Sequence, residues 1–141
     1  MASVFYNSGK RRILKAEIDL ETETLKLALV GASYIPDIDG HEFYADISNE
    51  ISGGGYSAGG RTLDNAVVGQ DNDNDQAVFD ADDLTWPIAS FTVHGAVLYQ
   101  DTGSAATSPL IAYFDFDQDY SPAGEDFTVQ WNPGGVLTLG D

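Results

Sequence analysis

Short runs of alternating apolar and polar residues, separated by turn-forming residues, fill this chain from residue 18 onward and constrain its fold more than any other feature. The clearest run is Phe127-Thr128-Val129-Gln130-Trp131, whose apolar side chains would share one buried face of a strand. Further runs, each bounded by Gly, Asn, Asp, Pro or Ser, lie at residues 25–30, 62–68, 76–81, 89–100, 109–116 and 136–139. Many short strands with turns between them predict an all-β fold, an antiparallel β-sandwich of jelly-roll or immunoglobulin-like type.

Two of these runs indicate which strand face is buried. In the run 25–30 three leucines occupy alternate positions, so they would lie on one face of a strand that ends at Gly31. The run 89–100 is the longest expected strand, and its predicted buried face carries Phe91, Val93, Val97 and Tyr99. From residue 34 to residue 60 the chain is rich in Asp and Gly, a composition that leaves room only for a short helical turn at residues 41–47.

The first 17 residues differ from the rest of the chain in charge. Four of the six basic residues fall between positions 10 and 15, whereas the whole chain carries 23 acidic residues and a net charge of −17. We therefore expect a basic N-terminal arm or short helix over residues 1–17, interrupted at Ser8-Gly9, and a single β-sandwich domain over residues 18–141. The residues expected to contact a partner are the basic cluster and its apolar neighbours: Val4, Phe5, Lys10, Arg11, Arg12, Ile13, Leu14 and Lys15. The alternative is a frayed, solvated terminus.

Composition argues against several classes of protein. The chain has no cysteine, so disulfides and thiolate sites are excluded. No apolar run approaches the ~20 residues of a membrane-spanning helix, and the N-terminus lacks the apolar stretch of a signal peptide. The negative charge disfavours nucleic acid, because phosphate binding needs clustered Lys and Arg over a broad surface. We expect a soluble protein with neither a membrane nor a nucleic acid as its direct partner.

The segment Asp71-Asn72-Asp73-Asn74-Asp75 is the best candidate for a metal site. Its oxygen-bearing side chains alternate as in calcium-binding loops, and Asp82 stands at the twelfth position counted from Asp71. However, Gln76 occupies the place that an EF-hand gives to glycine, and helix signals are absent on both sides. A solvated turn between two strands explains the same residues and is favoured, so we expect no metal or other cofactor.

Other side chains give only weak catalytic signals. Asp115, Asp117 and Asp119 alternate along one expected strand, where a carboxylate pair could hydrolyse a glycosidic bond, but a polar strand end is the simpler interpretation. The only histidines, His41 and His94, lack a third metal ligand, and no serine lies in a nucleophile-elbow motif. We therefore expect a protein that is not an enzyme.

Six sequence segments occur in a fixed order along the chain after residue 17: IDLETETLKLALVGASYIPDIDGHEFYADI, GYSAGGRTL, VFDADDLTWP, GAVLYQDTG, SPLIAYFDF and DFTVQWNPGGVLTL. Together they resemble a family of small proteins encoded in the structural modules of tailed bacteriophages. This resemblance implies a virion component of the head, neck or tail, made in the host cytoplasm. It favours a head decoration, or cement, protein that binds the outer surface of the major capsid protein lattice, stabilises it and gathers there as a trimer or dimer. The N-terminal segment would then clamp against an acidic neighbour.

Two other functions stay open. A collar, tail or fibre component would use the same fold within a different symmetry. A carbohydrate-binding module would use Trp86, Tyr99 or Trp131 as stacking surfaces for sugars, with calcium held by Asp71, Asp73 and Asp75.

Overall fold

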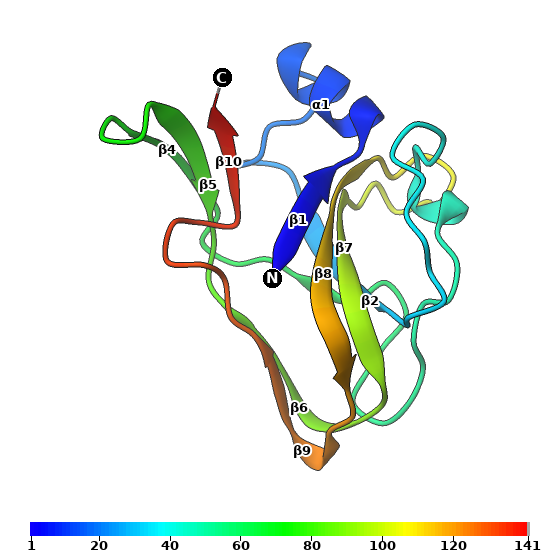
Figure 1. Cartoon of the computed structure of the whole chain (residues 1–141). Helices are drawn as coiled ribbons and strands as arrows, with labels where there is room; N and C mark the ends of the chain where they lie inside the picture. The colour runs from blue at the N-terminus through cyan, green and yellow to red at the C-terminus, as the bar shows by residue number, and fades with distance from the viewer. Residues whose placement is uncertain (141) are drawn as a thin grey trace.

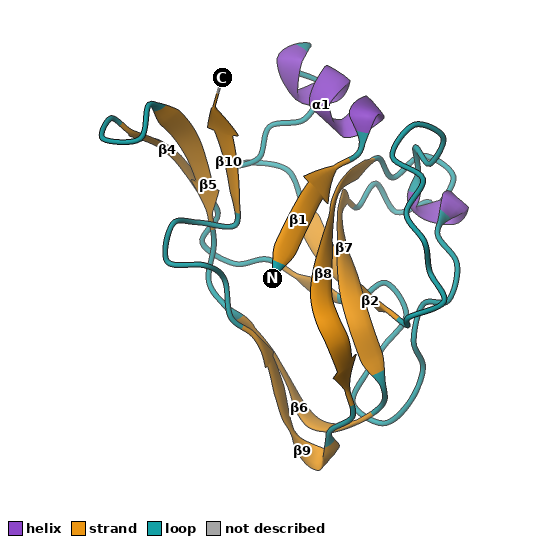
Figure 2. Cartoon of the chain, viewed as in Figure 1, coloured by secondary structure: helices purple, strands orange, loops and turns teal. Residues whose placement is uncertain are grey.

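A computed structural model describes residues 1–140 of the protein. Strands make up 46% of the chain and helix 8%, which confirms the predicted all-β class (Figure 2). The elements in chain order are β1 (Ala2–Phe5), α1 (Asn7–Leu14), β2 (Leu25–Val30), the 3-10 helix η1 (Tyr44–Asp46), β3 (Arg61–Thr62), β4 (Val67–Asp71), β5 (Gln76–Asp80), β6 (Leu84–Ser90), β7 (Val93–Gln100), β8 (Leu110–Tyr120), β9 (Ala123–Val129) and β10 (Leu137–Gly140).

The strands form three antiparallel sheets. The main sheet has the order β1-β8-β7-β2-β3, and the smaller sheets have the orders β10-β5-β4 and β6-β9. Figure 1 shows the two smaller sheets facing one side of the main sheet, with α1 beyond the end of β1. The arrangement is an antiparallel β-sandwich with one short helix near the N-terminus, as predicted.

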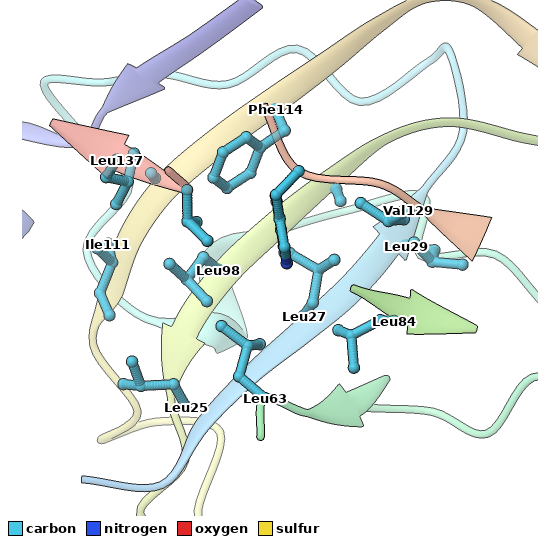
Figure 3. Packing of buried hydrophobic residues seen from close by; sticks show 14 of the residues in the cluster. Leu25, Leu27, Leu29, Leu63, Leu84, Leu98, Ile111, Phe114, Val129 and Leu137 are labelled. Carbon is cyan, nitrogen blue, oxygen red and sulfur yellow. The ribbon is translucent and has the colours of Figure 1, made fainter. Parts of the chain in front are cut away.

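Strand β2 lies between β7 and β3 in the main sheet and is buried on both faces. Leu25, Leu27 and Leu29 point into the core between the sheets, as their spacing predicts, and pack there with side chains such as Phe114, Leu98 and Val129 (Figure 3). Ala28 and Val30 point the other way, into a second core that contains four tyrosines: Tyr6, Tyr34, Tyr99 and Tyr113. The loop that includes η1 packs on this second core.

The prediction of one continuous strand over residues 89–100 is wrong. This run is divided between β6 and β7, which belong to different sheets. The predicted buried face is divided with it: Phe91 and Val93 lie in the core between the sheets, whereas Val97 and Tyr99 lie in the second core. The alternation of β7 is broken between Val93 and Ala96, both of which lie in the core between the sheets, at the place where the pairing with β8 shifts register.

The N-terminal segment is part of the sandwich. Strand β1 pairs with β8 along its whole length, from Ala2 opposite Asp115 to Phe5 opposite Ala112, and forms one edge of the main sheet. The boundary expected after residue 17 therefore does not separate the N-terminal segment from the main sheet, because β1 is one of the strands of that sheet. Directly after β1 comes Tyr6, which is fully buried and fixes the point where α1 begins.

Helix α1 runs through Ser8-Gly9, where the sequence predicts an interruption. The reason is close packing: a Cβ atom on Gly9 would lie 2.8 Å from the carbonyl oxygen of Leu110, so only glycine lets the helix lie this close to β8. The helix ends at Leu14, and Ala16 then adopts a positive φ of 57° that turns the chain away.

Candidate functional site

An apolar groove lies between α1, β1 and the sheet β10-β5-β4. Its volume is about 200 Å³, and apolar side chains form most of its wall. Segments far apart in the sequence contribute to it: Phe5 from β1, Ile13 and Leu14 from α1, Val68 from β4, and Leu137 and Leu139 from β10. The groove is therefore built where the N-terminal segment meets the smaller sheet.

Three side chains of this groove remain largely in water. The exposed fraction is 80% for Leu14, 54% for Leu139 and 45% for Val68. Single exposed apolar residues are ordinary on a protein surface, but several gathered around one groove mark an interaction site. Burying Leu14 fully against a partner would contribute up to about 1.5–3 kcal/mol, and Leu139 and Val68, which are already about half buried, would each contribute roughly half of that.

Lys10 gives the apolar groove a positive charge. It lines the groove and forms no salt bridge with any residue from 1 to 140. Lys15 directly follows α1 and lies outside the groove lining, and its Nζ atom is 3.4 Å from a carboxylate oxygen of Glu17. Lys10 is thus available to a negatively charged group at the groove.

Arg12 has a structural role. Its Nη2 atom donates a hydrogen bond of 2.9 Å to Glu42, its guanidinium lies 5.2 Å from the centre of the Phe43 ring, and its side chain is only 15% exposed. Arg11 reaches the same carboxylate at 3.5 Å from a more exposed position. Both arginines therefore hold α1 against the loop before η1.

The structure thus divides the eight residues predicted to contact a partner. The groove brings together Phe5, Lys10, Ile13 and Leu14. Three others, Arg11, Arg12 and Lys15, pair with acidic residues of the same chain. Val4 lines a different hollow, beside Ile35 and Tyr113.

Sequence reasoning missed the half of the groove that the smaller sheet provides. Val68 and Leu139 lie in runs predicted as strands, and the alternation of a strand does not tell which apolar side chains stay uncovered after the sheets pack. The one available signal is the pair Val67-Val68, where two consecutive exposed apolar residues break the alternation.

The segment Asp71-Asn72-Asp73-Asn74-Asp75 forms the tip of the β4–β5 hairpin. The Asp71 carboxylate accepts hydrogen bonds from the Asn74 side-chain amide at 2.7 Å and from the backbone N–H groups of Asp73 and Asn74 at 3.1 and 3.3 Å. These bonds, the Asn74 amide first, hold the pKa of Asp71 below its ordinary value. Among residues 1–140, no three His, Asp or Glu side chains are grouped so that they could hold a metal ion.

The second acidic cluster surrounds His94. Strand β8 bulges opposite this residue, and Asp117 within the bulge has a φ of 67°. His94 Nδ1 lies 2.8 Å from Asp119 and Nε2 lies 3.5 Å from Asp115. Both ring nitrogens therefore face carboxylates of the same chain.

The three aromatic residues considered as sugar-stacking surfaces are buried. The exposed fractions are 2% for Trp86, 3% for Tyr99 and 5% for Trp131. Their ring faces pack inside the protein, as is common for tryptophans at strand ends, so none of the three presents an exposed stacking surface to a sugar. Trp131 even donates its indole N–H to the backbone carbonyl of Asp82 at 3.0 Å, as a buried tryptophan requires.

No family model, curated protein or solved structure matches this chain. In the part of the chain that the structure describes, no helix is long and apolar enough to cross a membrane. The groove beside α1 is therefore the feature on which a functional conclusion rests.

Proposed function

We propose that this protein is a non-enzymatic structural component that docks through the groove beside α1 onto another protein of a larger assembly. The observation that carries this proposal is the convergence of Leu14, Val68 and Leu139 on one groove, each from a different element and each at least 45% exposed. A free monomer gains no stability from leaving these side chains in water, whereas a bound partner would bury them.

The sequence resemblance supplies the setting for this proposal: the virion of a tailed bacteriophage. In that setting the protein is a decoration protein on the outer surface of the major capsid lattice, with a collar, tail or fibre position as the alternative. The net charge of −17 supports a subunit that repels its own copies in solution and associates only on a scaffold. A trimeric or dimeric arrangement on the particle remains a prediction.

The test is to purify virions of the source phage and to locate this chain by electron cryomicroscopy. Leu14→Glu should lower its occupancy on the particle at least about tenfold, because a charge replaces an apolar contact worth about 1.5–3 kcal/mol. Ile35→Glu is the matched control, since Ile35 is 75% exposed but lies outside the groove. Its occupancy should stay unchanged.

The location of the density separates the alternatives. Density over the capsid lattice that is lost only in Leu14→Glu supports the decoration role. Density confined to the neck or tail rejects the head assignment and leaves a structural role. A particle that lacks the chain altogether rejects the virion setting.

A further inference from the structure

Strand β1 presents an unpaired backbone edge. Within residues 1–140 its only strand partner is β8. The Tyr6 N–H donates to the Ile111 carbonyl at 3.0 Å. In an antiparallel pair, every second residue directs its peptide groups to the partner strand, so the peptide groups of Val4 also face β8. The peptide groups of Ser3 and Phe5 therefore point toward the open edge.

A second open edge lies across from it. Strand β10 pairs only with β5 within the described residues, and Figure 1 shows β10 between β5 and β1, with both arrows pointing in a similar direction. The groove touches Phe5 of β1 together with Leu137 and Thr138 of β10. A neighbouring hollow of about 270 Å³ touches Ser3 together with the same two residues of β10. The two hollows therefore follow the space between the edge strands.

We propose that an extended segment of the partner protein adds to the free edge of β1 as an antiparallel strand in this space. The inference rests on the proposed function in that it takes the partner to be a protein. Backbone hydrogen bonds to Ser3 and Phe5 hold the segment, and alternate apolar side chains enter the groove beside Leu14. An acidic residue of the segment reaches Lys10.

Three features of the space favour an extended peptide segment: the strand edge, the apolar groove and the charge of Lys10. Unpaired peptide groups along a strand edge are satisfied by another extended backbone, whereas a helix has already paired its own. The apolar groove takes side chains from one face of the added strand, which requires apolar residues at every second position. Lys10 has no salt-bridge partner among the described residues, so an acidic side chain complements it.

The test selects binders from a displayed library of random twelve-residue peptides against the purified full-length chain. Ser3→Pro removes the N–H that points to the open edge without removing a bond to β8, and proline is tolerated on edge strands. Its melting temperature should match that of the original chain, and its affinity for the selected peptides should fall at least about tenfold. Lys10→Glu should weaken binding of peptides with an acidic residue about fivefold.

Lys15→Glu is the matched control for charge, because Lys15 directly follows α1 and lies outside the groove lining, so its substitution should leave peptide affinity unchanged. Enrichment of alternating apolar peptides that lose affinity in Ser3→Pro supports strand addition. Enrichment of no peptides, or of peptides that bind Ser3→Pro as well as the original chain, overturns it. Neither result depends on virions. Peptide binding without density on the capsid would therefore reject only the virion setting. Density on the capsid without peptide binding would reject only strand addition.

Discussion

Gly9 lies so close to Leu110 that a Cβ atom on the glycine would be 2.8 Å from the leucine carbonyl oxygen. Gly9→Ala must push α1 away from β8, and we expect it to lower the free energy of unfolding by about 1–3 kcal/mol. Gly69→Ala is the control, because no atom lies within 4 Å of a Cβ built there. Urea denaturation measures both, and equal stability of the two variants would contradict the close packing of α1.

Arg12 and Lys10 should differ in what they contribute to stability. Arg12→Ala removes the bond to Glu42 and the contact with the Phe43 ring, so we expect a loss of about 1–2 kcal/mol. Lys10→Ala should change the free energy of unfolding by less than about 0.5 kcal/mol. Chemical denaturation of both variants checks this, and a stable Arg12→Ala would show that Arg12 is free to serve a partner.

The buried tyrosines should make the fold sensitive to alkali. Burial, assisted by the hydrogen bond with Tyr34, raises the pKa of Tyr6 well above its ordinary value of 10.0, and burial with the nearby Asp115 raises the pKa of Tyr113 to about 12. The unfolded chain loses these protons first as pH rises, so the stability is complete below about pH 10 and falls above it. Above that pH, each such tyrosine lowers the free energy of unfolding by up to about 1.4 kcal/mol per pH unit, until the pH passes its pKa in the folded protein.

Urea denaturation from about pH 9 to about pH 11 measures this slope. Tyr6→Phe should make this slope shallower, because one fewer proton is lost on unfolding. At neutral pH it should lower the free energy of unfolding by about 1 kcal/mol, because the 2.7 Å hydrogen bond between Tyr6 and Tyr34 is lost. An unchanged slope in Tyr6→Phe would show that Tyr6 does not stay protonated in the folded protein.

Asp101 should stabilise the protein only while it is ionised. The Gly103 N–H at 2.9 Å, and then Lys26 at 3.0 Å, lower its pKa from the ordinary value of 3.8. The stabilisation is present above the unfolded pKa and is lost as pH falls through the lower folded pKa. We expect Asp101→Asn to cost about 1 kcal/mol at neutral pH and progressively less below about pH 4.

Unfolding of Asp101→Asn at neutral and acid pH measures that difference. Asp73→Asn, at the exposed hairpin tip, is the control and should change the free energy of unfolding by less than about 0.5 kcal/mol at either pH. A cost of Asp101→Asn that persists in acid would show that its charge is not the cause.

Strands whose alternation matches a single buried face could be predicted from the sequence. The leucines of β2 lie where their spacing places them, and Phe127, Val129 and Trp131 all pack on or in the core. The corner between β6 and β7 could not be predicted, since apolar residues continue through it and a register shift beyond Val93 follows from pairing with β8. Strand β1 is four residues long and owes its conformation to β8, so local pattern alone does not reveal it.

The candidate site was predictable only in its N-terminal half. Clustering of basic and apolar residues pointed to α1, but the local sequence does not reveal that Arg12 pairs with Glu42, thirty positions away. The tryptophans show a similar limit: Trp86 and Trp131 carry the same sequence signal whether their rings face water or the core, and only the packing of the sheets decides.

Pairing of β1 with β8 also sets the order in which the molecule can be completed during synthesis. Ala2 is made long before Asp115, so the two can pair only after the intervening residues have been made, at roughly 5–20 residues per second. Until then the outer edge of β8 has no partner strand, and closing so distant a contact is slow. For some seconds during synthesis, a chaperone or another nascent copy can therefore compete with β1 for that edge.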